Sequence, residues 1–186
     1  MKSQELLADI VLGVKGFLGR FLAGFTEENR TRQADHLPNH AMWVLGHVSV
    51  FMHHVAGLID GRPMPVGDFV DADGHAGGSE RFDVKSIGYA SKPAADASLY
   101  PTLERGRAIF EAAVDRLAAA VRAADDATLE REVDWGGTKI ALGSFVGRLV
   151  FHNGFHAGEI ADLRRALGFE GVIQYKPGQI AHNTKE

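Results

Sequence analysis

The sequence SFVGRLVFHNGFHAGEIADLRRAL, residues 144–167, decides the fold. Its apolar residues interleave with polar ones at helical spacing, and they are Leu149, Phe151, Phe155, Ile160 and Leu163. Ser144 is a suitable N-cap, and Gly168 is a suitable C-terminal stop. We therefore predict a long helix that begins at Gly143 or Ser144 and ends at Leu167.

The same predicted helix carries a polar face. Arg148, His152, His156 and Glu159 follow one another at helical spacing, and residues three or four apart project from one side of a helix. Such a face is either exposed or lines a polar cavity. Because the apolar neighbours should bury the helix as a whole, the combination favours a buried polar site.

Further helical patterns of apolar residues are found in three other segments, which are 3–24, 39–59 and 100–124. Residues 125–132 predict a short helical turn and residues 133–140 a small hairpin. Four long helices without alternating strands indicate an all-α fold, namely a four-helix bundle. We expect one domain over residues 1–186, with a core of about 5–168 and an irregular tail over 169–186.

A long connection separates the second and third predicted helices. Residues 61–98 hold many of the glycines and prolines and show little sustained periodicity. We interpret them as a long ordered loop with one short helix, and loops of this length are usually functional or disordered. We expect this loop to fold over one end of the bundle and to help form the mouth of a pocket.

Composition limits the classes of function. The chain of 186 residues has 20 Lys and Arg against 24 Asp and Glu, and its net charge of −4 argues against a nucleic-acid partner. No uncharged apolar run reaches the roughly 18 residues of a membrane span, and the N-terminal sequence does not resemble a signal peptide. We therefore expect a cytoplasmic protein with no membrane partner.

Histidine is the most informative residue type. The chain has nine histidines and no cysteine, so histidines and carboxylates are its only strong ligands for a transition metal. His152 and His156 have the spacing of the metalloprotease signature, but Asn153 stands where that signature needs a glutamate as general base. A protease is therefore excluded. The best candidate for a third ligand is His47, midway along the second predicted helix.

His54 lies seven residues after His47, roughly 10.5 Å along a helix, which is too far for both to bind one ion. His54 could still line the same cavity, whereas His53 points elsewhere. The remaining histidines are expected to be ordinary surface or hydrogen-bonded residues, and these are His36, His40, His75 and His182.

One turn imitates a calcium loop. The turn Asp71-Ala72-Asp73-Gly74, followed by Glu80, matches several positions of that loop. Its first position would be Phe69, which cannot coordinate calcium. We therefore predict an exposed acidic turn.

Two motifs together resemble the DinB-like superfamily. The first runs from Asn39 through Trp43 to His47, in the pattern Asn-His-x-x-Trp-x-Leu-Gly-His. The second runs from His152 to Gly168, in the pattern His-x-x-x-His-x-Gly-Glu-Ile-x-x-x-Arg-Arg-x-x-Gly. Tyr100-Pro101 at the start of the third helix is also similar to the family. The resemblance covers about residues 5–168.

The resemblance implies a four-helix bundle in which His47, His152 and His156 bind one divalent metal ion, and it makes a homodimer plausible. Three histidines suit Zn, Ni, Cu and Fe almost equally, and we expect Zn or Ni. Characterised members of the family include S-transferases and isomerases that depend on the thiols mycothiol or bacillithiol. Trp43, His54 and Arg148 are the residues that we expect to line the pocket around the metal.

Glu159 departs from the family pattern, since relatives commonly have glutamine there. A carboxylate at this position could be a fourth ligand, an acceptor for an imidazole N–H or a general base. We favour the imidazole contact, or an ion pair with Arg148 or Arg164, because three histidines already suffice for a catalytic site.

The sequence leaves three functions open. The first, which we favour, is an enzyme whose metal lowers the pKa of a low-molecular-weight thiol or of water, giving an S-transferase, isomerase or hydrolase that acts on a small molecule. The second is a non-catalytic protein in which the metal ties two helices together. The third is a metal-free bundle whose histidines bond to one another.

Overall fold

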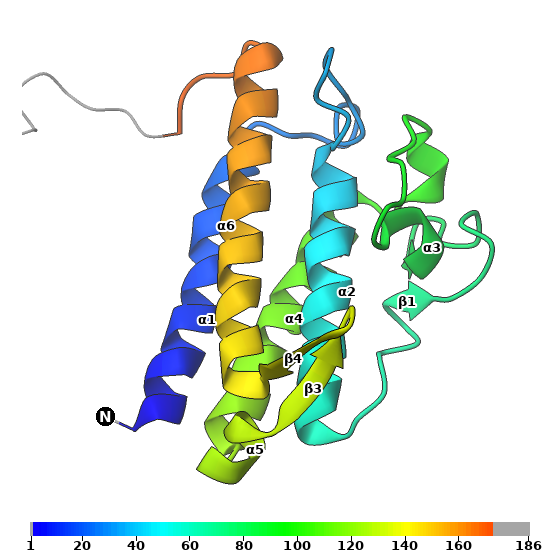
Figure 1. Cartoon of the computed structure of the whole chain (residues 1–186). Helices are drawn as coiled ribbons and strands as arrows, with labels where there is room; N and C mark the ends of the chain where they lie inside the picture. Colours follow the sequence, from blue (N-terminus) through cyan, green and yellow to red (C-terminus); the bar gives the residue numbers. More distant parts are fainter. Residues whose placement is uncertain (1, 173–186) are drawn as a thin grey trace, which may run out of the picture.

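The computed structural model describes residues 2–172 and is mainly α, with 57% helix. Four long helices lie side by side (Figure 1), and they are α1 (Ser3–Phe21), α2 (Ala41–Asp60), α4 (Leu103–Ala123) and α6 (Leu142–Ala166). The predicted tail over 169–186, with His182, lies almost entirely outside the described residues.

Short elements fill the connections between the long helices. Between α2 and α4 these are β1 (Phe69–Val70), β2 (Phe82–Asp83), α3 (Val84–Ile87) and the 3-10 helix η1 (Ala97–Leu99). Between α4 and α6 they are α5 (Asp126–Glu130), β3 (Glu132–Trp135) and β4 (Thr138–Ala141). The β3–β4 pair is an antiparallel hairpin, as the sequence predicts for residues 133–140.

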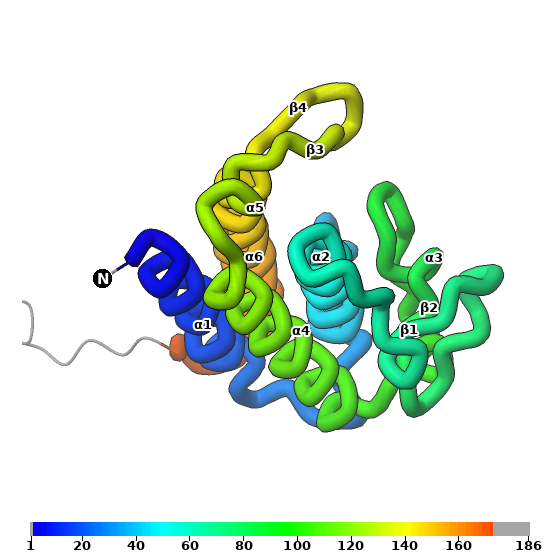
Figure 2. Tube along the Cα trace, turned by 90° about the horizontal axis from the view of Figure 1, so that it is seen from below, coloured from blue at the N-terminus to red at the C-terminus, as the bar shows by residue number. Residues whose placement is uncertain are grey.

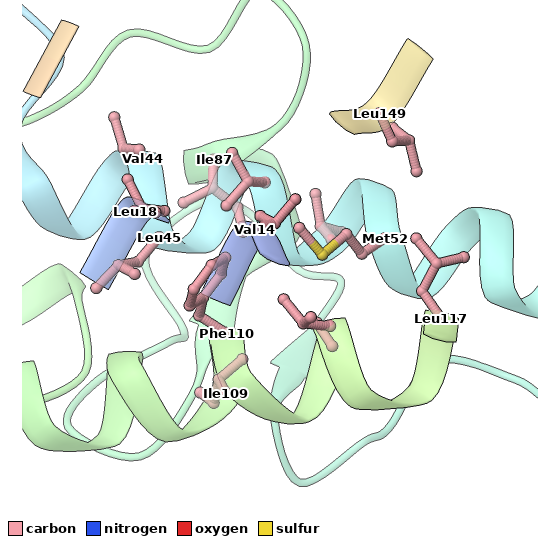
Figure 3. Close-up of a cluster of buried hydrophobic side chains, with 14 of the residues drawn as sticks. Val14, Leu18, Val44, Leu45, Met52, Ile87, Ile109, Phe110, Leu117 and Leu149 are labelled. Atoms are coloured by element: carbon pink, nitrogen blue, oxygen red, sulfur yellow. The ribbon is translucent and has the colours of Figure 1, made fainter. Parts of the chain in front are cut away.

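The four long helices contact one another in a ring: α1 contacts α4 and α6, and α2 also contacts α4 and α6. Helices α1 and α6 run in one direction, and α2 and α4 run in the other (Figure 1). Apolar side chains from all four helices meet in the centre, as the close-up of Val14, Leu45, Phe110 and Leu149 shows (Figure 3). Burial of this apolar surface is the main force that holds the helices together.

The starts of the helices differ slightly from the sequence prediction. The side chain of His40 caps α2 by accepting a hydrogen bond from the Trp43 N–H. Helix α6 begins at Leu142, directly after β4, so Ser144 lies in its first turn and is not the N-cap. The Leu142 N–H, at the start of α6, donates instead to the Arg131 carbonyl at 3.0 Å.

The long connection packs along the side of α2 rather than over an end of the helices (Figures 1 and 2). Its turns are held by the buried carboxylate of Asp83, which accepts hydrogen bonds from the N–H groups of Gly74, Ala76 and Lys85. Burial alone would raise the pKa of Asp83, but these hydrogen bonds hold it below its usual value. The turn that imitates a calcium loop therefore directs N–H groups at Asp83, a carboxylate of the same chain.

Gly46 permits the close approach of this connection to α2. A Cβ atom at Gly46 would lie 2.7 Å from Phe82 Cδ1 and 2.9 Å from Ile87 Cγ2, closer than real Cβ atoms come. The missing side chain thus lets β2 and α3 pack directly on the helix next to His47.

Helix α2 is long and apolar enough to cross a membrane by length and composition, but 72% of its most apolar window is buried inside the protein. Its apolar character is that of a core helix, since it packs against α3, α4 and α6.

Candidate metal centre

His47 of α2 and His152 and His156 of α6 form one cluster between the two helices. The Nε2 atom of His152 lies 3.2 Å from Nε2 of His47 and 3.0 Å from Nε2 of His156. One nitrogen of each ring lies within 4.8 Å of the other two, the arrangement of three ligands around one ion. The cluster brings together the three histidines that the sequence analysis selects.

The hydrogen-bond partners of two rings determine where their protons are. His47 Nδ1 lies 2.7 Å from the carbonyl oxygen of Ile87, and His156 Nδ1 lies 2.7 Å from Oε2 of Glu159. A carbonyl and a carboxylate can only accept, so each Nδ1 carries the hydrogen. In a neutral ring with its hydrogen on Nδ1, the Nε2 atom presents a lone pair, and the Nε2 atoms of both residues face the centre of the cluster.

His152 completes the donor set. Its Nε2 faces the two lone pairs, while its buried Nδ1 has no hydrogen-bond partner among residues 2–172. Burial, reinforced by the neighbouring imidazoles, lowers the pKa of His152 to about 4, and burial likewise lowers that of His47 to about 4. The rings of His47 and His152 are thus neutral near pH 7, which is the form that binds a transition metal. Three converging imidazole nitrogens fit such an ion.

Glu159 lies on the outer side of His156. Its Oε2 accepts hydrogen bonds from His156 Nδ1 and, at 3.0 Å, from Asn39 Nδ2. Burial would raise the pKa of Glu159, but the hydrogen bonds from His156 and Asn39 outweigh it and hold the pKa below its usual value. Of the partners considered for this carboxylate, the structure shows the imidazole N–H.

Trp43 positions the ring of His47. The two rings stack with their centroids 4.3 Å apart, and the indole N–H of Trp43 donates to the Ser91 hydroxyl at 2.9 Å. Ser91 and Ile87 both belong to the long connection. Two hydrogen bonds from α2 to this connection therefore determine the orientation of the His47 side chain.

A cavity of about 230 Å³ adjoins the cluster. It lies between α2 and α6, with walls that also come from the β3–β4 hairpin and from the segment after α3, and its lining includes His47, His152 and Arg148.

His54 is not among the residues that line this cavity, and its side chain is exposed. The adjacent His53 is buried instead, and its Nδ1 lies 3.2 Å from Nη1 of Arg116. Seven residues fall only about 20° short of two full turns, so the distance of roughly 10.5 Å along α2, rather than rotation, separates His54 from the cluster.

Several residues of the site are missing from the sequence prediction. Asn39 was part of a motif, and its spacing from His47 offers no hint that it meets Glu159, 120 residues away. Phe51, Tyr89, Trp135 and Phe145 also line the cavity. Phe51 could have been found, because it lies one turn after His47 on the same helix.

The sequence model of the DinB superfamily matches residues 18–160, and the chain belongs to this superfamily. In fold, the chain is similar to a conserved protein of Enterococcus faecalis in a crystal structure. The TM-score is 0.68 with 12% sequence identity, over 90% of this chain and 99% of the other. No curated protein matches the chain.

Proposed function

We propose that the four long helices form a four-helix bundle that holds a divalent transition metal on His47, His152 and His156, and that the protein is a metal-dependent enzyme. When bound, the ion would supply Lewis acidity that lowers the pKa of a thiol or water. The observation that carries the proposal is the convergence of three imidazole nitrogens beside a cavity. Three protein ligands leave room for a further one, as catalytic sites require.

The residues of this chain would prepare the site in two ways. The Ile87 carbonyl and the Glu159 carboxylate keep a hydrogen on Nδ1 of His47 and of His156. The Nε2 atom of each ring is then left to bind the metal. The aromatic walls of the cavity would shield part of a small substrate from water. The metal is expected to be Zn or Ni, and an external low-molecular-weight thiol is the nucleophile we propose.

The test is elemental analysis of protein purified without a His tag, followed by a screen of low-molecular-weight thiols with electrophiles. We expect about one ion per chain and turnover that is lost in His47→Ala with the fold intact by circular dichroism. A tag-free protein that binds none of Zn, Ni, Cu or Fe would contradict the proposal.

The alternative is a non-catalytic metal that ties α2 to α6. It is favoured by one observation, namely that the ligands come from two long helices that already pack together. Metal binding without turnover of any thiol or hydrolysable substrate, together with a large loss of stability on chelation, would support this alternative.

We also propose a cytoplasmic homodimer. Helices α1 and α6, which contact each other, expose large apolar side chains that a second copy could cover, and these are Leu6, Ile10, Phe17, Phe151 and Phe155. Light scattering on the purified protein tests the dimer, and a monomer mass at micromolar concentration contradicts it.

A further inference from the structure

The cavity beside the histidine cluster has walls of unusual composition. Phe51, Tyr89, Trp135 and Phe145 supply aromatic surface, and they come from α2, the long connection, the hairpin and α6. The rings of Trp135 and Phe145 lie 4.7 Å apart, and those of Trp135 and Phe51 lie 5.7 Å apart. Such walls suit a flat apolar group, because ring faces and edges provide most of the contact.

Arg148 is the one permanently charged residue among the described residues that line the cavity. It lies one helical turn before His152, on the same side of α6. Its guanidinium makes no hydrogen bond or ion pair with residues 2–172, whereas Arg165 on the same helix is paired with Asp162. A guanidinium presents several N–H donors in a planar fork that matches a carboxylate.

Volume and charge together restrict the ligand. At about 230 Å³ the cavity is smaller than the roughly 300–1,000 Å³ of sites for drug-sized molecules. No carboxylate is found among the described residues that line it, so the arginine makes it electropositive. Aromatic walls alone would also suit an organic cation, but Arg148 would repel one.

We propose that this cavity binds a small substrate with a flat apolar body and a carboxylate, and that Arg148 holds the carboxylate while the apolar body lies against Trp135 and Phe51. This inference rests on the proposed function and names its substrate class. The reacting group of such a substrate would face His47 and His152, which line the same cavity.

The experiment is an NMR titration of the metal-free protein and of the zinc-loaded protein with benzoate, benzamide, benzylamine and mercaptoacetate. The indole N–H resonance of Trp135, assigned with Trp135→Phe, reports on the cavity. The variants are Arg148→Gln and Arg148→Lys, and Arg165→Gln is the matched control because it removes an exposed arginine from the same helix outside the cavity.

We expect benzoate to shift the Trp135 signal in both forms of the protein and to bind more tightly than benzamide or benzylamine. Arg148→Gln should weaken benzoate binding about tenfold or more, since a charge-assisted hydrogen bond is lost. Arg148→Lys should restore part of the affinity, and Arg165→Gln should not change it.

Three results would overturn the inference. Benzamide or benzylamine binding as well as benzoate would show that charge does not select the ligand. Benzoate affinity unchanged in Arg148→Gln would place the carboxylate elsewhere, on the ion if only the zinc form binds. Mercaptoacetate binding more tightly than benzoate to the metal-free protein would show that the carboxylate recognised in the cavity belongs to the thiol rather than to the substrate. Because the metal-free protein is titrated, failure of metal binding and failure of this inference are separate outcomes.

Discussion

Two buried histidines, one at the N-cap of helix α2 and one within the helix, have surroundings that differ in one respect. His40, at its start, accepts a hydrogen bond from the Trp43 N–H through Nδ1, and its Nε2 lies 2.9 Å from the Ala94 carbonyl, to which it donates. His47, two turns later, bonds to a carbonyl through Nδ1, but its Nε2 faces two other imidazoles. Burial lowers the pKa of both histidines to about 4.

The comparison shows that burial and a lowered pKa do not identify a metal ligand. What separates the two histidines is the partner of the second nitrogen. For His40 the chain satisfies both nitrogens, so the ring has a structural role. For His47 the second nitrogen faces two other imidazoles, where a bound cation or a hydrogen on Nε2 of His152 can satisfy it.

The largest expected effect is that of metal on stability. Saturating zinc should raise the free energy of unfolding by about 4 kcal/mol at a concentration a thousandfold above Kd. His156→Ala should remove this gain, because only two of the three imidazole ligands remain. His40→Asn should keep it, since asparagine also caps helices. Denaturant unfolding with and without zinc measures both, and a zinc-dependent gain that survives His156→Ala would contradict the comparison.

The second effect concerns pH. The folded protein keeps His40 neutral down to about pH 4, whereas the unfolded chain protonates it near pH 6.5. Stability from this residue is therefore complete above about pH 6.5 and is lost as the pH falls towards 4. The loss is about 2 kcal/mol between pH 7 and 5 and about 3 kcal/mol by pH 4.

His40→Asn should remove that part of the pH dependence, so its unfolding free energy should fall less steeply between pH 7 and 5 than that of the natural chain. Chemical denaturation of the metal-free proteins at the two pH values measures the difference. Parallel pH profiles would mean that His40 does not titrate as its surroundings indicate.

The third effect is steric. Gly46→Ala should destabilise the protein by about 1–3 kcal/mol, because the new methyl group would overlap Phe82 and Ile87. It should also weaken metal binding, since movement of Ile87 removes the carbonyl that orients His47. Gly13→Ala is the control: nothing lies within 4 Å of its Cβ position, and the change should stabilise α1 by up to about 1 kcal/mol. Equal effects of the two substitutions on metal affinity would argue against the role of Ile87.

The smallest effect tests the outer partner of His156. Glu159→Ala should lower metal affinity by about tenfold to a hundredfold, because the imidazole loses the acceptor that orients it. Glu159→Gln should cost less than Glu159→Ala, since an amide oxygen still accepts from Nδ1. Competition with a metal-binding dye gives the affinities. A glutamine variant as weak as the alanine variant would show that the negative charge, rather than the hydrogen bond, matters.

Much of the helical structure follows from sequence because helices are local. Apolar spacing predicts α1, α2, α4 and α6 to within three residues at their ends, and the turn chemistry of Gly136-Gly137 predicts the hairpin. His54 lies outside the cavity lining because two turns of helix carry it roughly 10.5 Å along α2 from His47. The position of the long connection could not be predicted, since its packing on α2 depends on contacts between distant segments.

The sequence by itself determined which helices form and which histidines share their faces, because periodicity and i, i+4 spacing act within a few turns of one chain. Only the tertiary structure decided the chemical state of the site. It brought the Ile87 carbonyl to His47, Asn39 to Glu159, and Trp135 to the cavity. Every residue has a carbonyl, so no sequence pattern marks the one that will orient a histidine. Packing of distant segments selects it.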